Sequence, residues 1–193
     1  MATAIRSSDL LKRQKFLIDQ NVTWLRQAII LLEQMDDRTY MASPPTLAPH
    51  RVGGHLRHIL EFYECFLDGI GSSHIDYDSR QRDELVETCR TAALEKTRSI
   101  IYRLERSPEL RGDAIVWVRV EDAQAVRLDD SFMTSSVSRE MQVLSSHTIH
   151  HFALIAMTVK ALGFPTDREF GMAPSTLRYN ASRQAAAAAV GAA

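Results

Sequence analysis

The chain has 193 residues, 45% hydrophobic and 24% charged, which is ordinary for a single globular domain with a substantial core. Its 23 basic and 24 acidic residues give a net charge of −1, which argues against a nucleic-acid surface because such a surface needs a basic excess. The longest uncharged apolar run, FALIAMTV, is far too short to span a bilayer, so we expect no membrane partner.

Four segments carry apolar residues at a helical period and predict helices over residues 9–36, 55–67, 83–107 and 137–162. The loop at 37–50 contains Pro44, Pro45 and Pro49, which forbid regular helix there. Asp83 is the expected N-cap of the third helix.

Residues 114–132 are β-branched and partly alternating, which predicts a short β-hairpin or an extended crossover between the third and fourth helices. Four long helices with one long crossover are typical of an all-α four-helix bundle. We therefore expect one domain over residues 1–180. The Ala-rich tail, residues 181–193, is expected to be loosely ordered.

The segment SSHTIHHFALI places three of the seven histidines within five positions of the fourth helix. His147 and His151 are four residues apart, so they stand one above the other on one helical face. Leu144 and Ile155 share that face, which should point toward the interior. His150 is expected at the edge of the site or facing solvent.

The second helix carries His55 and His58, three residues apart, and Phe62 and Cys65 continue the same stripe. One of these two histidines could meet the pair on the fourth helix. Three neutral imidazoles with a vacant position are typical of a catalytic zinc, nickel or iron site. The spacing alone leaves the choice between His55 and His58 open.

Four segments in combination resemble the DinB-like family, over residues 5–179 of this chain. They are HLRHILEF, DYDSRQRD, SSHTIHHFALI and FGMAPSTLRY. The resemblance implies a four-helix protein that holds a divalent metal on three histidines near one end of the bundle. It also implies His58, His147 and His151 as the ligands, with His55 orienting a ligand or touching substrate.

The resemblance further implies an enzyme in which the ion activates a thiol or water. Thiol-dependent group transfer, with a low-molecular-weight thiol as the small-molecule substrate, is the reaction class implied, and a hydrolase is the other enzymatic reading. No individual catalytic residue follows from the sequence. The two cysteines, Cys65 and Cys89, indicate reduced thiols and a cytoplasmic protein.

Two further segments offer side chains for substrate. The segment DYDSRQRD contains Asp78, Arg80 and Arg82, and a guanidinium there could bind a substrate carboxylate, although a solvated loop that caps the third helix is the simpler interpretation. The segment FGMAPSTLRY ends in Arg178 and Tyr179, which either belong to a packed strap or to a lid over the metal.

A non-catalytic function is the alternative hypothesis. In this case the chain is a metal-binding or dimerising helical bundle with a stress-related role. Ile29 and Ile30 on the first helix could serve a homodimer interface, or they could equally belong to the core. In this alternative the histidines are core or vestigial residues, and the spectrum of the cobalt-loaded protein tests this, since d–d bands are expected only if an open imidazole site exists.

Overall fold

The computed structural model describes residues 2–119 and 132–191. Short 3₁₀ turns at 45–47, 70–72 and 108–111 connect longer elements. The helices are α1 (Ala2–Gln34), α2 (Asp37–Met41), α3 (Val52–Gly69), α4 (Glu84–Thr88), α5 (Arg90–Arg106), α6 (Val137–Ala161) and α7 (Pro174–Gly191). The strands are β1 (His74–Asp76), β2 (Ile115–Arg119) and β3 (Phe132–Ser136).

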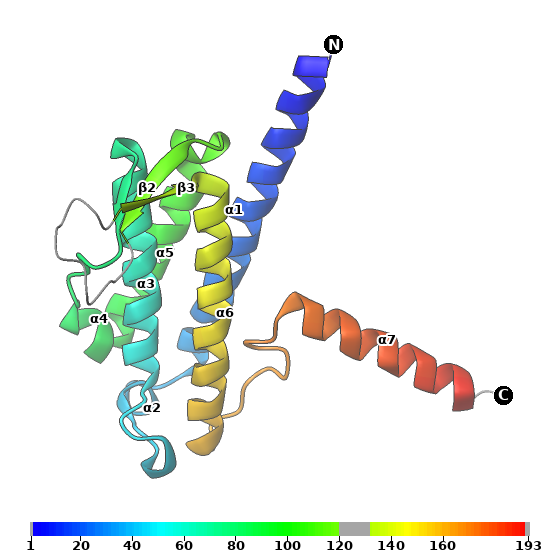
Figure 1. Cartoon of the computed structure of the whole chain (residues 1–193). Helices are drawn as coiled ribbons and strands as arrows, with labels where there is room; N and C mark the ends of the chain where they lie inside the picture. The colour runs from blue at the N-terminus through cyan, green and yellow to red at the C-terminus, as the bar shows by residue number, and fades with distance from the viewer. Residues whose placement is uncertain (1, 120–131, 192–193) are drawn as a thin grey trace.

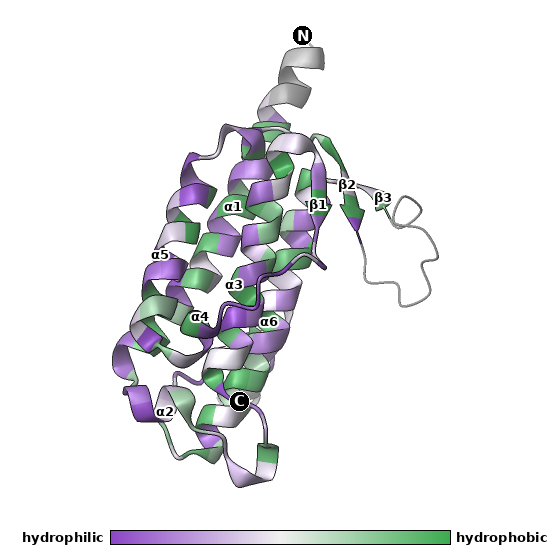
Figure 2. Cartoon of the chain, turned by 90° about the vertical axis from the view of Figure 1, so that its left-hand side faces the viewer, coloured by the Kyte–Doolittle hydropathy of each residue, from purple (hydrophilic) through white to green (hydrophobic). Residues whose placement is uncertain are grey.

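Four of the long helices, α1, α3, α5 and α6, lie side by side and enclose the core (Figures 1 and 2). Helix α3 contacts α5 and α6, and α1 contacts the same two helices. Polar and apolar residues alternate along these helices in Figure 2, as expected for helices that bury one face. The fold is thus mostly helical, with a small sheet at one side. The fully buried side chains of this core include Leu25, Leu32, Leu56, Ile59, Tyr63, Ile100, Leu104 and Phe152.

The predicted helices agree with the structure except at the third, and the segment 37–50, expected to be a loop, begins with the short helix α2. The segments predicted at 9–36, 55–67 and 137–162 correspond to α1, α3 and α6. Their ends agree with the predicted bounds to within a few residues, except that α1 begins earlier, at Ala2. The segment predicted at 83–107 breaks at Cys89, whose backbone is extended (φ −123°, ψ 109°), into α4 and α5. Asp83 caps α4 as predicted, since its carboxylate accepts hydrogen bonds from the backbone of Leu85 and Val86.

The sheet has the order β1-β2-β3. Strands β2 and β3 are antiparallel, with Trp117 opposite Thr134, and they match the hairpin or extended crossover expected between the third and fourth predicted helices. The centre of that crossover, residues 120–131, lies outside the described residues. Strand β1 was not predicted, and it pairs in parallel with β2, with Ile75 opposite Val118.

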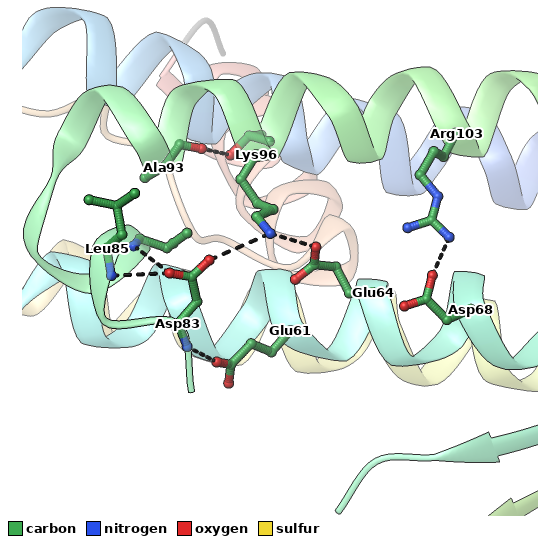
Figure 3. Close-up of polar contacts among 10 residues, drawn as sticks. Glu61, Glu64, Asp68, Asp83, Leu85, Ala93, Lys96 and Arg103 are labelled. Atoms are coloured by element: carbon green, nitrogen blue, oxygen red, sulfur yellow. Dashed lines mark hydrogen bonds and ion pairs between the residues drawn. The ribbon is translucent and has the colours of Figure 1, made fainter. Parts of the chain in front are cut away.

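The segment between β1 and α4 is fixed to α3 by polar contacts, shown in Figure 3. The backbone N–H of Asp83 donates to Glu61 of α3 at 2.7 Å. Lys96 of α5 lies 2.7 Å from Glu64 and 3.6 Å from the Asp83 carboxylate. These contacts fix Asp83, the end of the segment that carries Arg80, against α3 and α5.

Helix α7 extends away from the other helices (Figure 1). It includes the Ala-rich tail up to Gly191, and the described side chains of that tail, residues 181–185, are exposed. The single domain over 1–180 and the loose order of the tail remain predictions. Among the described residues, no helix combines the length and apolar character needed to cross a membrane.

Ile29 and Ile30, the two residues considered for a homodimer interface, differ in their surroundings. Ile29 packs against the core, whereas Ile30 is exposed. The homodimer remains a prediction.

Candidate metal centre

Three histidines from two helices converge at one point between α3 and α6. They are His58 of α3 and His147 and His151 of α6, and one ring nitrogen of each lies within 4.8 Å of the other two. The Nε2 atoms of His58 and His147 are 3.1 Å apart. Two imidazole nitrogens bound to one tetrahedral zinc lie about 3.3 Å apart, from a Zn–N bond of about 2.05 Å. The spacing therefore fits a shared ion.

The helical period explains why the two histidines of α6 stand together. Four positions is just over one turn, and the ring centroids of His147 and His151 are 4.5 Å apart. Leu144 and Ile155 on the same face are buried, as the sequence predicts. The rings of His58 and His151 are 4.7 Å apart across the two helices. The inward face of α6 thus points the pair at α3.

The three rings are neutral at physiological pH. Burial, followed by the neighbouring imidazoles and Arg80, lowers the pKa of His58 to about 4. Burial and nearby histidines likewise lower the pKa of His147 to about 4 and that of His151 to about 3. A neutral imidazole has a free lone pair, which is the form that binds metal.

His55 also contacts His151. Its Nδ1 is 3.0 Å from Nδ1 of His151, and its ring stacks on that of His50 at 5.2 Å. Only one proton can lie between the two Nδ1 atoms. If His151 supplies it, Nε2 of His151 is free to bind a metal, which is the usual role of a ligand's outer nitrogen. Of the two candidates on α3, His58 belongs to the three-residue cluster and His55 supports it.

Arg80 reaches the cluster from the segment between β1 and α4. It donates a hydrogen bond to Nδ1 of His58 at 2.9 Å, and its guanidinium lies 4.9 Å from the centre of the Phe62 ring. The DYDSRQRD segment therefore reaches the histidine cluster, a point that the sequence left undecided. A guanidinium only donates, so Nδ1 of His58 must accept.

An aromatic wall covers one side of the cluster. Phe62 lies 4.3 Å from the His147 ring and stacks on Tyr77 at 4.9 Å. The Tyr77 hydroxyl donates to Glu140 at 2.9 Å, which fixes the ring in place. This wall limits water at the histidines and contributes to the low pKa of His147.

Unpartnered buried atoms mark the same region. Among the described residues, Nδ1 of His147 and Nε2 of His55 are buried and have no hydrogen-bond partner. A buried polar atom without a partner is uncommon, and a water, ion or ligand is a frequent explanation. Both atoms thus lack a partner within the described residues, and for His147 this atom is Nδ1, whereas Nε2 faces His58.

The remaining predicted residues are more dispersed. His150 is exposed, with its ring 5.2 Å from that of His151, in line with a place at the edge of the site.

Asp78 is exposed and lies 3.8 Å from Arg119, and Arg82 is exposed on a turn with a φ of 53°. Arg178 and Tyr179 are exposed on α7, which points away from α3 and α6, so the structure does not bring them to the histidines (Figure 1).

Sequence reasoning missed the residues on the far side of the cluster. A cavity of about 460 Å³ adjoins His58 and His151, and Arg57 and Glu87 line it. Arg57 Nη1 is 3.0 Å from Glu87. The sequence did carry a signal that Arg57 belongs to the site, because it stands next to His58 in the segment HLRH. The sequence carries no signal for Glu87, because its contact with Arg57 depends on the packing of α4 against α3.

Comparisons with known proteins do not assign a family to the chain. No family model matches the chain. A segment of 109 residues is 30% identical to FK506-binding protein 5 of Rhizopus delemar. This match covers 54% of the chain but 27% of that protein, so the chain spans about a quarter of the length of the relative it matches.

Proposed function

We propose that this chain is a metal-dependent enzyme of the DinB-like type, built on a four-helix bundle. His58, His147 and His151 would hold one divalent ion, with zinc, nickel and iron as the candidates. One observation carries the proposal: three ring nitrogens from α3 and α6 lie within 4.8 Å of one another. Three protein ligands leave a coordination position for a reactant.

A bound ion at such a site lowers the pKa of a thiol or water and so supplies a nucleophile at neutral pH. The residues of the chain would prepare that chemistry. His55 orients His151 through their Nδ1 contact, and Phe62 keeps water from one side of the histidines. Group transfer to or from a low-molecular-weight thiol is the proposed reaction, and hydrolysis is the alternative.

Metal analysis tests this proposal. Protein purified without chelators or an affinity tag should contain about one ion per chain, because three neutral imidazoles match that stoichiometry. His147→Ala should lose the ion while the helices still form. His150→Ala is the matched control, since His150 neighbours the cluster but is exposed.

Two outcomes contradict the proposal. One is wild-type protein without metal that gains no thermal stability from added zinc or nickel. The other is a cobalt-loaded protein that shows no d–d bands, because an open imidazole site must give them.

A further inference from the structure

The cavity beside the histidine cluster has the composition of an anion site. It is lined by the proposed ligands His58 and His151 and by Arg51, His55, Arg57 and Glu87. Its charged side chains are the guanidinium groups of Arg51 and Arg57 and the carboxylate of Glu87, which together carry a net charge of +1. The volume of about 460 Å³ accommodates a small molecule.

Two nitrogens in this lining are buried and lack partners among the described residues: Nε of Arg57 and Nε2 of His55. His55 is only 8% exposed. Arg57 pairs through Nη1 with Glu87 at 3.0 Å, and its buried Nε has no partner, so the Nε edge of its guanidinium is unpaired. That edge carries two parallel N–H groups and matches a carboxylate.

The start of α3 adds a third feature. Its N-cap residue, Arg51, makes no side-chain capping bond, and the first turn has no acidic residue. Both Arg51 and Gly54 of this turn line the cavity. The unpaired N–H groups and the helix dipole therefore favour negative charge here. The charge, the unpaired nitrogens and the helix start of this cavity together favour an anion.

We propose that this cavity binds the carboxylate of a small molecule whose reacting group lies at the three histidines, with the Nε edge of Arg57 as its main contact. The inference rests on the proposed function and narrows its substrate class to carboxylate-bearing molecules. Glu87 occupies the other edge of the guanidinium and holds it in position. Because Glu87 is itself an anion, it also weakens the attraction for the guest carboxylate.

The test compares 3-mercaptopropionate with 2-mercaptoethanol, a thiol of similar size without the carboxylate. Binding to the cobalt-loaded protein is followed by the visible spectrum and by calorimetry. Wild-type protein should bind 3-mercaptopropionate about tenfold more tightly, since a charge-assisted hydrogen bond contributes at least that much. Arg57→Met should remove the preference for 3-mercaptopropionate over 2-mercaptoethanol.

Two further variants sharpen the result. Glu87→Gln should strengthen 3-mercaptopropionate binding, because it removes the competing negative charge without changing the shape of the side chain. Arg98→Met is the matched control: Arg98 pairs with Glu33 and is exposed, so the preference should persist. Equal binding of the two thiols by wild-type protein, or an unchanged preference in Arg57→Met, overturns the inference.

The two proposals fail in different ways. Cobalt that does not bind would overturn the proposed function. The metal-free protein then decides the inference alone, with propionate and propionamide as probes. The inference is supported if propionate binds more tightly than propionamide and if this difference depends on Arg57. Equal binding of the two probes contradicts the inference.

Discussion

At the scale of single residues, the proton on His58 decides whether its Nε2 atom is free for the proposed ion. Arg80 donates to Nδ1, so the proton of the neutral ring lies on Nε2, the atom that faces His147. An ion bound to Nε2 must displace that proton, and the neutral ring then carries its proton on Nδ1. There the Nδ1–H group points at an N–H group of Arg80, and two donors repel each other. Arg80 therefore holds His58 in place but opposes the ion, through both this clash and its positive charge.

We predict that Arg80→Gln binds zinc more tightly than the wild type, by about tenfold, which corresponds to about 1.4 kcal/mol. A glutamine carbonyl can accept the proton from Nδ1 and carries no charge. The measurement is a competition titration of zinc against a chromophoric chelator. Arg82→Gln, on the same segment but exposed, should change nothing. Weaker binding by Arg80→Gln would mean that Arg80 supports the ligand set.

The same histidines make stability depend on pH. The pKa of His58 and of His147 is lowered to about 4 in the folded chain, whereas an unfolded histidine keeps a pKa near 6.5. Between about pH 6.5 and pH 4 the unfolded chain binds protons that the folded chain excludes. The free energy of unfolding must therefore fall as the pH falls through this window and be fully present above it.

We predict that metal-free protein is clearly less stable at about pH 4.5 than at about pH 7, and that His147→Leu shows a weaker dependence because one such group is gone. Urea unfolding at a series of pH values measures both. A free energy of unfolding that stays constant across the window, or a slope unchanged in the variant, would show that these rings titrate normally when folded.

At the scale of elements, the contact between α3 and α4 decides the shape of the cavity. Gly53 lies in the first turn of α3, and a Cβ there would come within 1.9 Å of the carbonyl oxygen of Glu87. Only glycine allows this approach. The carbonyl belongs to α4, so the close packing of the two helices also sets where the Glu87 side chain meets Arg57.

Gly53→Ala should therefore destabilise the protein by about 2 kcal/mol or more, because backbone must move to admit the methyl group. It should also weaken binding in the cavity. Gly71→Ala is the matched control, since a Cβ at Gly71 meets nothing within 4 Å. Thermal unfolding of both variants measures the effect. Equal stability of Gly53→Ala and wild type would show that α4 can retreat from α3 at little cost.

The sequence predicts elements to different extents, for physical reasons. The apolar period of α6 is long and uninterrupted, so both the helix and the inward face of His147 and His151 could be read from it. The break at Cys89 could not, because the apolar pattern continues on both sides of it. Strand β1 has three residues, and its partner β2 is about forty positions away, so only tertiary pairing creates it.

At the scale of the whole molecule, the histidine cluster depends on assembly of the helices. His58 and His147 are 89 positions apart in the chain, so their Nε2 atoms meet only when α3 and α6 pack together. The sequence predicted which faces turn inward but not how the helices align along their axes. The alignment selects His58 for the cluster and leaves His55 one turn behind, a choice that spacing within one helix cannot make.

The C-terminal part of the chain divides into a packed strap and a projecting helix. Phe170 is buried and stacks on Phe152 of α6 with ring centroids 4.8 Å apart. A Cβ on the next residue, Gly171, would come within 2.7 Å of the α6 backbone. By contrast, Tyr179 on α7 is 61% exposed, and α7 points away from the other helices (Figure 1). The strap should contribute to stability and α7 should not.

We predict that a chain ending at Ala173 keeps the stability of the full chain to within about 0.5 kcal/mol, because the helix that it loses buries little apolar surface. A chain ending at Thr166 should lose about 2–4 kcal/mol, since it gives up the buried Phe170 ring and its stacking on Phe152. Both truncations should retain zinc, because the histidine cluster lies on α3 and α6. Urea unfolding and zinc titration of the two truncated chains measure these effects. If the shorter truncation at Ala173 already loses stability or zinc, α7 acts on the body of the protein in solution, and the lid that the sequence offered for Arg178 and Tyr179 becomes the better account.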